Sequence, residues 1–185
     1  DVYKRQALRI LEAWRAERNV DQVVRDAQDE RFMPLETIRA SPYTPGRIYE
    51  HHRGGGSEYL AVDALLNEMV SFSAQWSLLM QFLRRSTLPT DAAVFDGRLA
   101  RAIKDTMLHV FVPLQMYALQ ANVQQVHMLD TPDLQSLPYA SSLPDDMFFA
   151  LRTVLSRSLS TSSVDVAERI VSQAVAMVET YFVEI

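Results

Sequence analysis

Residues 143–185 decide the fold, and they read LPDDMFFALRTVLSRSLSTSSVDVAERIVSQAVAMVETYFVEI. Pro144 suits the first position of a helix, where its missing N–H group would lack a partner in any case. Asp145 and Asp146 follow in the first turn, where negative charge favours the positive end of the helix dipole. The apolar residues that then recur at helical spacing are Met147, Phe148, Leu151, Val154, Leu155 and Leu159.

A serine-rich run, residues 160–163, interrupts this helix. Ser162 followed three residues later by Asp165 is a variant of the capping box and predicts the start of a second helix. Because no stop signal follows that helix, we expect the chain to be a fragment of a longer protein. The stretch therefore predicts a helical hairpin over 143–185, whose second helix has a heptad seam at Ala167, Val171, Ala174, Val178, Tyr181 and Ile185.

The preceding part of the chain also has helical periodicity. We expect a helix over residues 7–28, a long flexible loop over 29–57 and a helix over 58–85. Residues 1–6 fit poorly with the helix expected after them, and we set them aside as a non-native leader. The helix over 58–85 has a second heptad seam, formed by Leu65, Met69, Phe72, Trp76, Leu79 and Leu83.

Two further helices are expected over 92–110 and 114–128, separated by Pro113, which kinks or restarts a helix. No strand signal and no fixed-period repeat is found. Residues 7–185 are thus predicted to be part of one larger α-helical rod. The fold class is all-α, with long antiparallel helices stacked as bundles in series.

Composition narrows the function classes. The chain has 185 residues, of which 48% are hydrophobic, and this content is enough for a substantial core. It has no cysteine, so disulfides, thiolate metal sites and cysteine nucleophiles are excluded. The formal net charge is −5, and no segment has the basic surplus of a nucleic-acid-binding surface. No apolar run is long enough to span a bilayer.

The residue types that carry chemistry do not converge. His51 and His52 are adjacent on a glycine-rich loop, whereas two metal ligands on one helix face need helical spacing. Such a pair could bind a metal weakly, but a solvated loop is the favoured interpretation. The run 54–56 of glycines is followed by Ser57 and Glu58 rather than by the Lys of a phosphate loop. We predict no catalytic, cofactor-binding or metal-binding residues, no cofactor and no enzymatic activity.

Four segments carry a family resemblance. The segments PDDMFF (144–149) and SLSTSSVD (158–165) resemble the middle-to-C-terminal part of subunit 4 of the conserved oligomeric Golgi complex. Upstream, DALLNEM (63–69) and LMQFLRR (79–85) are similar to a helix of the same subunit, and the segments occur in the same order. Because these are helix and turn patterns, the resemblance implies no site residues.

The resemblance implies a non-catalytic scaffold subunit of a Golgi vesicle-tethering complex. Such a subunit would support retrograde intra-Golgi vesicle transport through helix-mediated contacts with the other subunits and with the SNARE fusion machinery. It would lie in the cytoplasm, on the cytosolic face of Golgi membranes, as a peripheral protein whose membrane association is indirect. No nucleic-acid partner is implied.

Periodicity alone leaves two alternatives open. Another helical tether, such as an exocyst-like subunit, would show the same long helices. A peripheral membrane-surface module would need a basic concave face or a polybasic amphipathic helix. The negative net charge of the chain and its low number of lysines, two, argue against that module.

Overall fold

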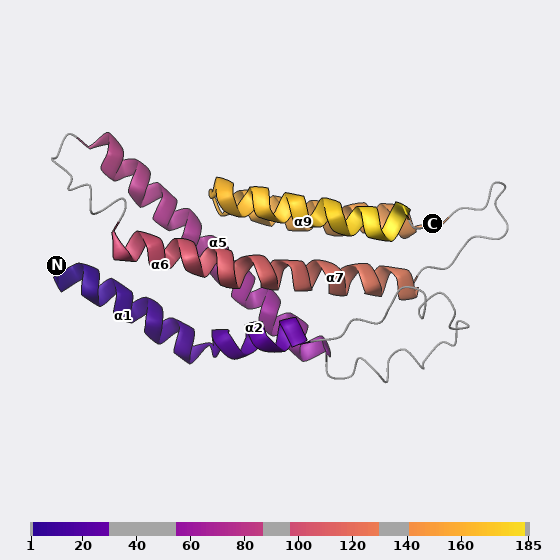
Figure 1. Cartoon of the computed structure of the whole chain (residues 1–185), viewed down its shortest axis with the longest axis horizontal. Coiled ribbons are helices and arrows are strands. Elements are labelled where there is room, and N and C mark those ends of the chain that lie inside the picture. The colour runs from indigo at the N-terminus through magenta and orange to yellow at the C-terminus, as the bar shows by residue number, and fades with distance from the viewer. Residues whose placement is uncertain (1, 30–54, 87–96, 130–140, 184–185) are drawn as a thin grey trace.

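The computed structural model describes residues 2–29, 55–86, 97–129 and 141–183. Every regular element in these ranges is a helix, which confirms the all-α fold class (Figure 1). The elements are α1 (Val2–Glu17), α2 (Val20–Asp29), α5 (Gly55–Arg85), α6 (Arg98–Thr106), the π-helix η2 (Met107–Phe111), α7 (Val112–Leu129), α8 (Leu143–Ser160) and α9 (Val164–Val183).

A rod formed by α6, η2 and α7 runs through the middle of the fold (Figure 1). The helix α7 contacts α2, α5, α8 and α9. A helix that is apolar on most sides is stable only where other elements cover it, and these four helices do so. The buried apolar residues of η2 and α7 are Met107, Val110, Phe111, Val112, Leu114, Tyr117, Ala118, Leu119 and Val123.

The central rod passes Pro113 without a break. Pro113 has no N–H group, and in a regular α-helix its ring would clash with the carbonyl group of His109, four residues earlier. The π-helical turn η2 precedes the proline, and the N–H of Val112 bonds to the carbonyl of Met107, five residues back. Because this turn is wider than an α-turn, α6 and α7 stay in line. The predicted kink or restart is replaced by a continuous rod.

The single helix predicted over 7–28 is two helices in the structure. Asn19 has a φ of 48°, a left-handed conformation that ends α1 and that Asn tolerates better than most residues. The turn lets α1 lie against α6 and α2 lie against α7, where Val20 is fully buried. Residues 2–6 form the first part of α1. That they are a non-native leader stays a prediction.

The helices on either side of the predicted loop over 29–57 extend into that range. Asp29 is the last residue of α2, and α5 begins at Gly55. Residues 30–54 lie outside the described residues. The helix expected over 92–110 is described from its N-cap, Gly97. The helix boundaries at Asp29 and Gly55 therefore differ slightly from those predicted, and the loop between them stays a prediction.

The heptad seam predicted on α5 is buried along its first half. Leu65 and Met69 are buried, but Phe72 and Leu79 are 42% and 47% exposed. Trp76, which we expected in the core, is partly exposed. Figure 1 shows the reason: α5 crosses the central rod obliquely, so that its C-terminal end extends away from the other helices.

The helices α8 and α9 pack against each other as a hairpin, and their buried faces agree with the predicted ones only in part. Phe148, Leu159 and Val171 were expected on the apolar faces, but they are 63%, 70% and 45% exposed. Met147, Leu151, Val154 and Ala174 were also predicted on these faces and are buried, and Ala150, Ser158, Val166 and Ile170 complete the buried faces. The buried residues are Met147, Ala150, Leu151, Val154 and Ser158 on α8, and Val166, Ile170 and Ala174 on α9.

The turn of the hairpin is not closed by the predicted capping box. Ser163 rather than Ser162 precedes α9, and its carbonyl accepts the N–H of Ala167 at 3.0 Å. The turn is held from α5: the hydroxyl of Ser73 donates to the carbonyl of Thr161 at 2.8 Å. Both residues of this hydrogen bond are buried. A buried polar contact thus fixes where the hairpin sits on α5.

Two ion pairs also tie the hairpin to the other helices. Arg157 of α8 pairs with Asp63 of α5 at 2.5 Å, and Lys104 of α6 pairs with Asp165 of α9 at 2.5 Å. The hydrogen bond to Asp165, with the attraction between the two charges, raises the pKa of Lys104. Because Lys104 and Asp165 are more than half exposed, we expect their pair to add little stability.

Leu66 and Leu78 on α5 provide a matched test of where the core ends. Leu66 is fully buried and Leu78 is 65% exposed. We expect Leu66→Ala to lower the free energy of unfolding by about 2–5 kcal/mol, because it removes buried methyl groups and leaves a cavity. Leu78→Ala should change it by less than about 0.5 kcal/mol. Urea unfolding followed by circular dichroism measures both values, and similar values would contradict the described packing.

Ser73 and Ser71 test the anchor of the hairpin in the same way. Ser73→Ala leaves the buried carbonyl of Thr161 without its donor, and we expect a loss of about 1–3 kcal/mol. Ser71 is exposed and bonds within its own helix, to the carbonyl of Asn67 at 3.0 Å. Ser71→Ala should therefore be nearly neutral in the same urea titration. Equal effects of the two substitutions would show that the α5 contact does not hold the turn.

Candidate partner-binding surface

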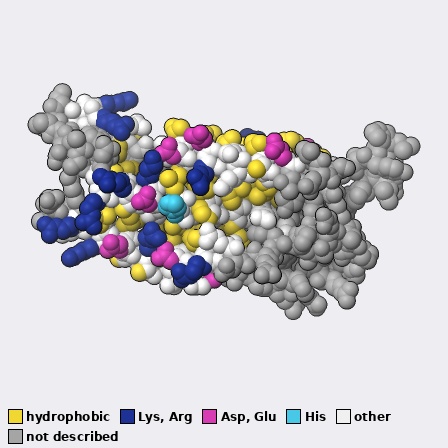
Figure 2. Space-filling model, viewed as in Figure 1, with side chains coloured by type: hydrophobic (Ala, Val, Ile, Leu, Met, Phe, Trp, Pro, Cys, Tyr) yellow, Lys and Arg dark blue, Asp and Glu magenta, His cyan; other side chains and the backbone are white. Residues whose placement is uncertain are grey.

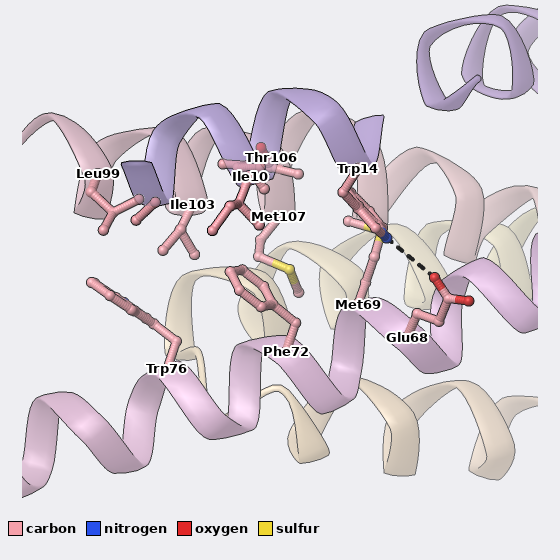
Figure 3. Close-up of a pocket in the computed structure, with 12 residues that line it drawn as sticks. Ile10, Trp14, Glu68, Met69, Phe72, Trp76, Leu99, Ile103, Thr106 and Met107 are labelled. Carbon is pink, nitrogen blue, oxygen red and sulfur yellow. Dashed lines mark hydrogen bonds between the residues drawn. The ribbon is translucent and has the colours of Figure 1, made fainter. Parts of the chain in front are cut away.

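An apolar groove lies where α1, α5 and α6 meet, with a volume of about 300 Å³ (Figure 3). Its walls come from segments that are far apart in the sequence. These segments come together because α1 and α5 both pack against the central rod. Since α1 and α5 also diverge from each other, a hollow remains between them. The lining residues are Ala7, Ile10, Leu11, Trp14, Glu68, Met69, Phe72, Trp76, Leu99, Ile103, Thr106 and Met107. We call this feature the α1–α5–α6 groove.

The groove has a buried floor and an exposed apolar rim. Its buried apolar floor residues are part of the core. On the rim, Ile10 is 70% exposed and Phe72 is 42% exposed, although both are large apolar side chains. Exposed apolar side chains around a hollow are typical of surfaces that bind other molecules. The apolar residues of the floor are Leu11, Met69, Ile103 and Met107.

Glu68 is the acidic residue that lines this groove, and two neighbours hold its carboxylate. Trp14 donates its indole Nε1–H to Glu68 Oε2 at 3.2 Å, as Figure 3 shows. Arg18 donates to the other carboxylate oxygen, Oε1, at 2.8 Å. The negative charge is therefore compensated, and the Trp14 ring is held against α5.

The end of the molecule beside the groove is rich in arginine. Residues 5–12, 76–86 and 97–103 contain six arginines and one acidic residue, Glu12. Figure 2 shows Lys and Arg side chains gathered at the left of the view, where α1 and α6 begin and α5 ends. We call this the arginine-rich end. Its exposed arginines are Arg5, Arg9, Arg84, Arg85, Arg98 and Arg101.

Sequence reasoning missed this surface. Each of the three segments contributes only two of the six arginines, so no segment stands out in a scan along the chain. Phe72 and Trp76 were assigned to a packed seam because their spacing is helical. The helix that carries Ile10 was recognised, but its place beside α5 was not. One signal for this surface was available in the sequence: the heptad spacing of apolar residues on α5 continues well beyond the residues that are buried.

The predicted absence of a chemical site is not overturned. Among residues 2–29, 55–86, 97–129 and 141–183, no group of three or more His, Asp or Glu is placed to hold a metal ion. His51 and His52 lie outside these ranges. Asp145 and Asp146 are exposed in the first turn of α8, where their charge favours the helix dipole. No helix that the structure describes combines the length and apolar content of a membrane span.

Glu68 can be tested through the tryptophan that it holds. We expect Glu68→Ala to free the Trp14 indole, so that acrylamide quenches the tryptophan fluorescence more strongly. Because the contacts of Glu68 are partly exposed, stability should fall by no more than about 1 kcal/mol. Glu12→Ala, on the exposed face of α1, is the matched control and should leave quenching unchanged. Equal quenching in the two variants would mean that Glu68 does not position the ring.

Helices α5 and α8, which carry segments of the family resemblance, contact each other in the fold. Asp63 belongs to the upstream region on α5, and it pairs with Arg157 in the first helix of the hairpin. No match was found among curated proteins or among solved structures. Residues 2–185, however, match a protein family described as COG4 transport protein, middle alpha-helical bundle. Because the match covers nearly the whole chain, the chain belongs to the COG4 transport protein family.

Proposed function

We propose that this chain is a section of a non-catalytic scaffold subunit in a Golgi vesicle-tethering complex, where it supports retrograde intra-Golgi transport. Family membership supports a role in a multisubunit Golgi transport complex. The observation that carries the proposal is the α1–α5–α6 groove, an apolar surface with no cluster of metal-binding groups in the described ranges. Such a surface suits binding to another protein better than it suits catalysis.

The mechanism of this scaffold is burial of exposed apolar helix faces against partner subunits. In protein interfaces a few large side chains supply most of the binding energy. Several helices of this chain present such side chains to solvent, among them Phe82 at 68%, Phe149 at 71% and Leu159 at 70% exposed. Different faces can therefore serve different partners, as a scaffold requires.

The remaining features of the proposal come from the family. We propose that the other subunits of the conserved oligomeric Golgi complex are the main partners and that the SNARE fusion machinery is a further one. The parent subunit would be a longer helical rod on the cytosolic face of Golgi membranes, attached peripherally through its partners. No cofactor is required for this role.

Co-purification tests the proposal directly. The full-length parent protein, tagged and purified gently from cells, should bring the other Golgi-complex subunits with it in stoichiometric amounts. Mass spectrometry identifies them and gives their ratios. Recovery of exocyst-like subunits would mean that the chain is a scaffold in another tethering complex. Recovery of the parent protein alone would overturn the proposal.

A further inference from the structure

The C-terminal half of α5 keeps apolar residues at heptad spacing after it leaves the core. Met69 is 2% exposed, whereas Phe72 and Leu79, further along the same seam, are 42% and 47% exposed. Two more large apolar side chains, Leu78 and Phe82, flank this seam and are 65% and 68% exposed. Heptad seams pair with a second helix, because that pairing removes the whole apolar stripe from water. The buried part of this seam has partners in the fold, and the exposed part is available to a partner. We call the exposed residues Phe72, Leu78, Leu79 and Phe82 the exposed α5 strip.

The charge around this strip restricts the kind of partner. The arginine-rich end lies at the ends of the same three helices that line the groove, although the chain as a whole has a net charge of −5. Glu68, the acidic lining residue, is already paired with Arg18. Complementary charge speeds association and disfavours partners of like charge. The surface therefore favours an acidic ligand.

We propose that the α1–α5–α6 groove and the exposed α5 strip beyond it bind an amphipathic helix of a partner protein whose polar face is acidic. This inference deepens the proposed function and rests on it for the presence of a protein partner. The groove and the strip together extend along α5 from Glu68 to Arg85, about 26 Å at the rise of an α-helix, which suits a partner helix of about five turns. Large apolar side chains of that helix would fill the hollow between Ile10 and Trp76.

The shape of the surface favours a helix over a bilayer. The apolar residues surround a hollow of about 300 Å³, and its floor of Met69 and Met107 is buried. A bilayer surface cannot enter a hollow of this size, whereas side chains that project from a helix can. Membrane-binding proteins instead present apolar side chains outward from a helix that lies on the bilayer.

The tryptophans allow a direct binding assay. The chain has two tryptophans, Trp14 and Trp76, and both line the groove. The probes are three synthetic helical peptides without tryptophan: one with a leucine heptad stripe and a glutamate polar face, one with the same stripe and a lysine polar face, and one with the glutamates kept but the leucines scattered. We expect the first peptide to shift the fluorescence of the 185-residue chain, with an affinity that falls as salt is raised. The other two should bind at least about tenfold more weakly.

Matched variants place the binding on the groove. Ile10 and Leu159 are both 70% exposed, on α1 and on α8. Ile10→Asp should lower the affinity for the first peptide by about tenfold or more, and Leu159→Asp should leave that affinity unchanged. Charge reversal of Arg9 and Arg98 together should reduce both the affinity and its salt dependence, whereas Arg152→Glu, at an exposed position of α8, should not. Unchanged thermal melts show that the exposed substitutions leave the fold intact.

Several outcomes would overturn the inference. These are equal or tighter binding of the lysine peptide, no effect of Ile10→Asp, and binding to anionic phosphatidylserine vesicles without binding to any peptide. If the chain forms a dimer and Ile10→Asp dissociates it, the groove binds a second copy of the chain instead. The co-purification experiment is independent of these results. If the first peptide does not bind but the other subunits still co-purify, only the proposal of an acidic partner helix is rejected. If the subunits do not co-purify, the scaffold role itself is rejected.

Discussion

The fold depends on the burial of α7 from almost every direction. A helix with Leu114, Ala118, Leu119 and Val123 all below 2% exposure cannot be stable alone in water, because each face would expose apolar surface. Four helices from three parts of the chain are needed to cover it. The same packing buries Gln115, whose amide atoms have no hydrogen-bond partner among the described residues. Such a group costs about 1–3 kcal/mol, so apolar burial must outweigh a polar penalty at this point.

Much of the architecture could be predicted from the sequence because helical periodicity is a local property. The all-α class, the helix α5 and the two helices of the hairpin were predicted from spacing, breaks and caps. The faces of these helices were less predictable, since they depend on the elements against which each helix packs. Phe148 was placed on the apolar face by its helical spacing, yet it is 63% exposed, whereas Ala150 and Ser158 face the core, where small side chains let α8 lie close to its neighbours. The π-turn before Pro113 and the left-handed Asn19 are backbone solutions that no spacing rule indicates.

The candidate surface could not be predicted for a different reason. Its arginines and its apolar rim lie on three helices that are separated along the chain, and only the fold places them together. A scan for charge clusters along the sequence finds two arginines at a time. The extension of the α5 seam beyond Met69 was visible, but a spacing rule cannot tell whether the second half of a seam is covered by the same chain. The oblique crossing of α5 over the central rod decides this point.

That crossing also explains why exposed apolar residues persist on α5. If α5 ran parallel to the central rod, its whole seam would be buried within the bundle, and no apolar strip would remain for another protein. The crossing leaves Phe72 and Leu79 in contact with water, and this exposure adds nothing to the stability of the chain itself. A seam that keeps its heptad spacing where it is only partly covered by its own bundle is accounted for by a contact with another molecule. The buried half, through Leu66 and Ser73, meanwhile holds α5 in the position from which that contact is made.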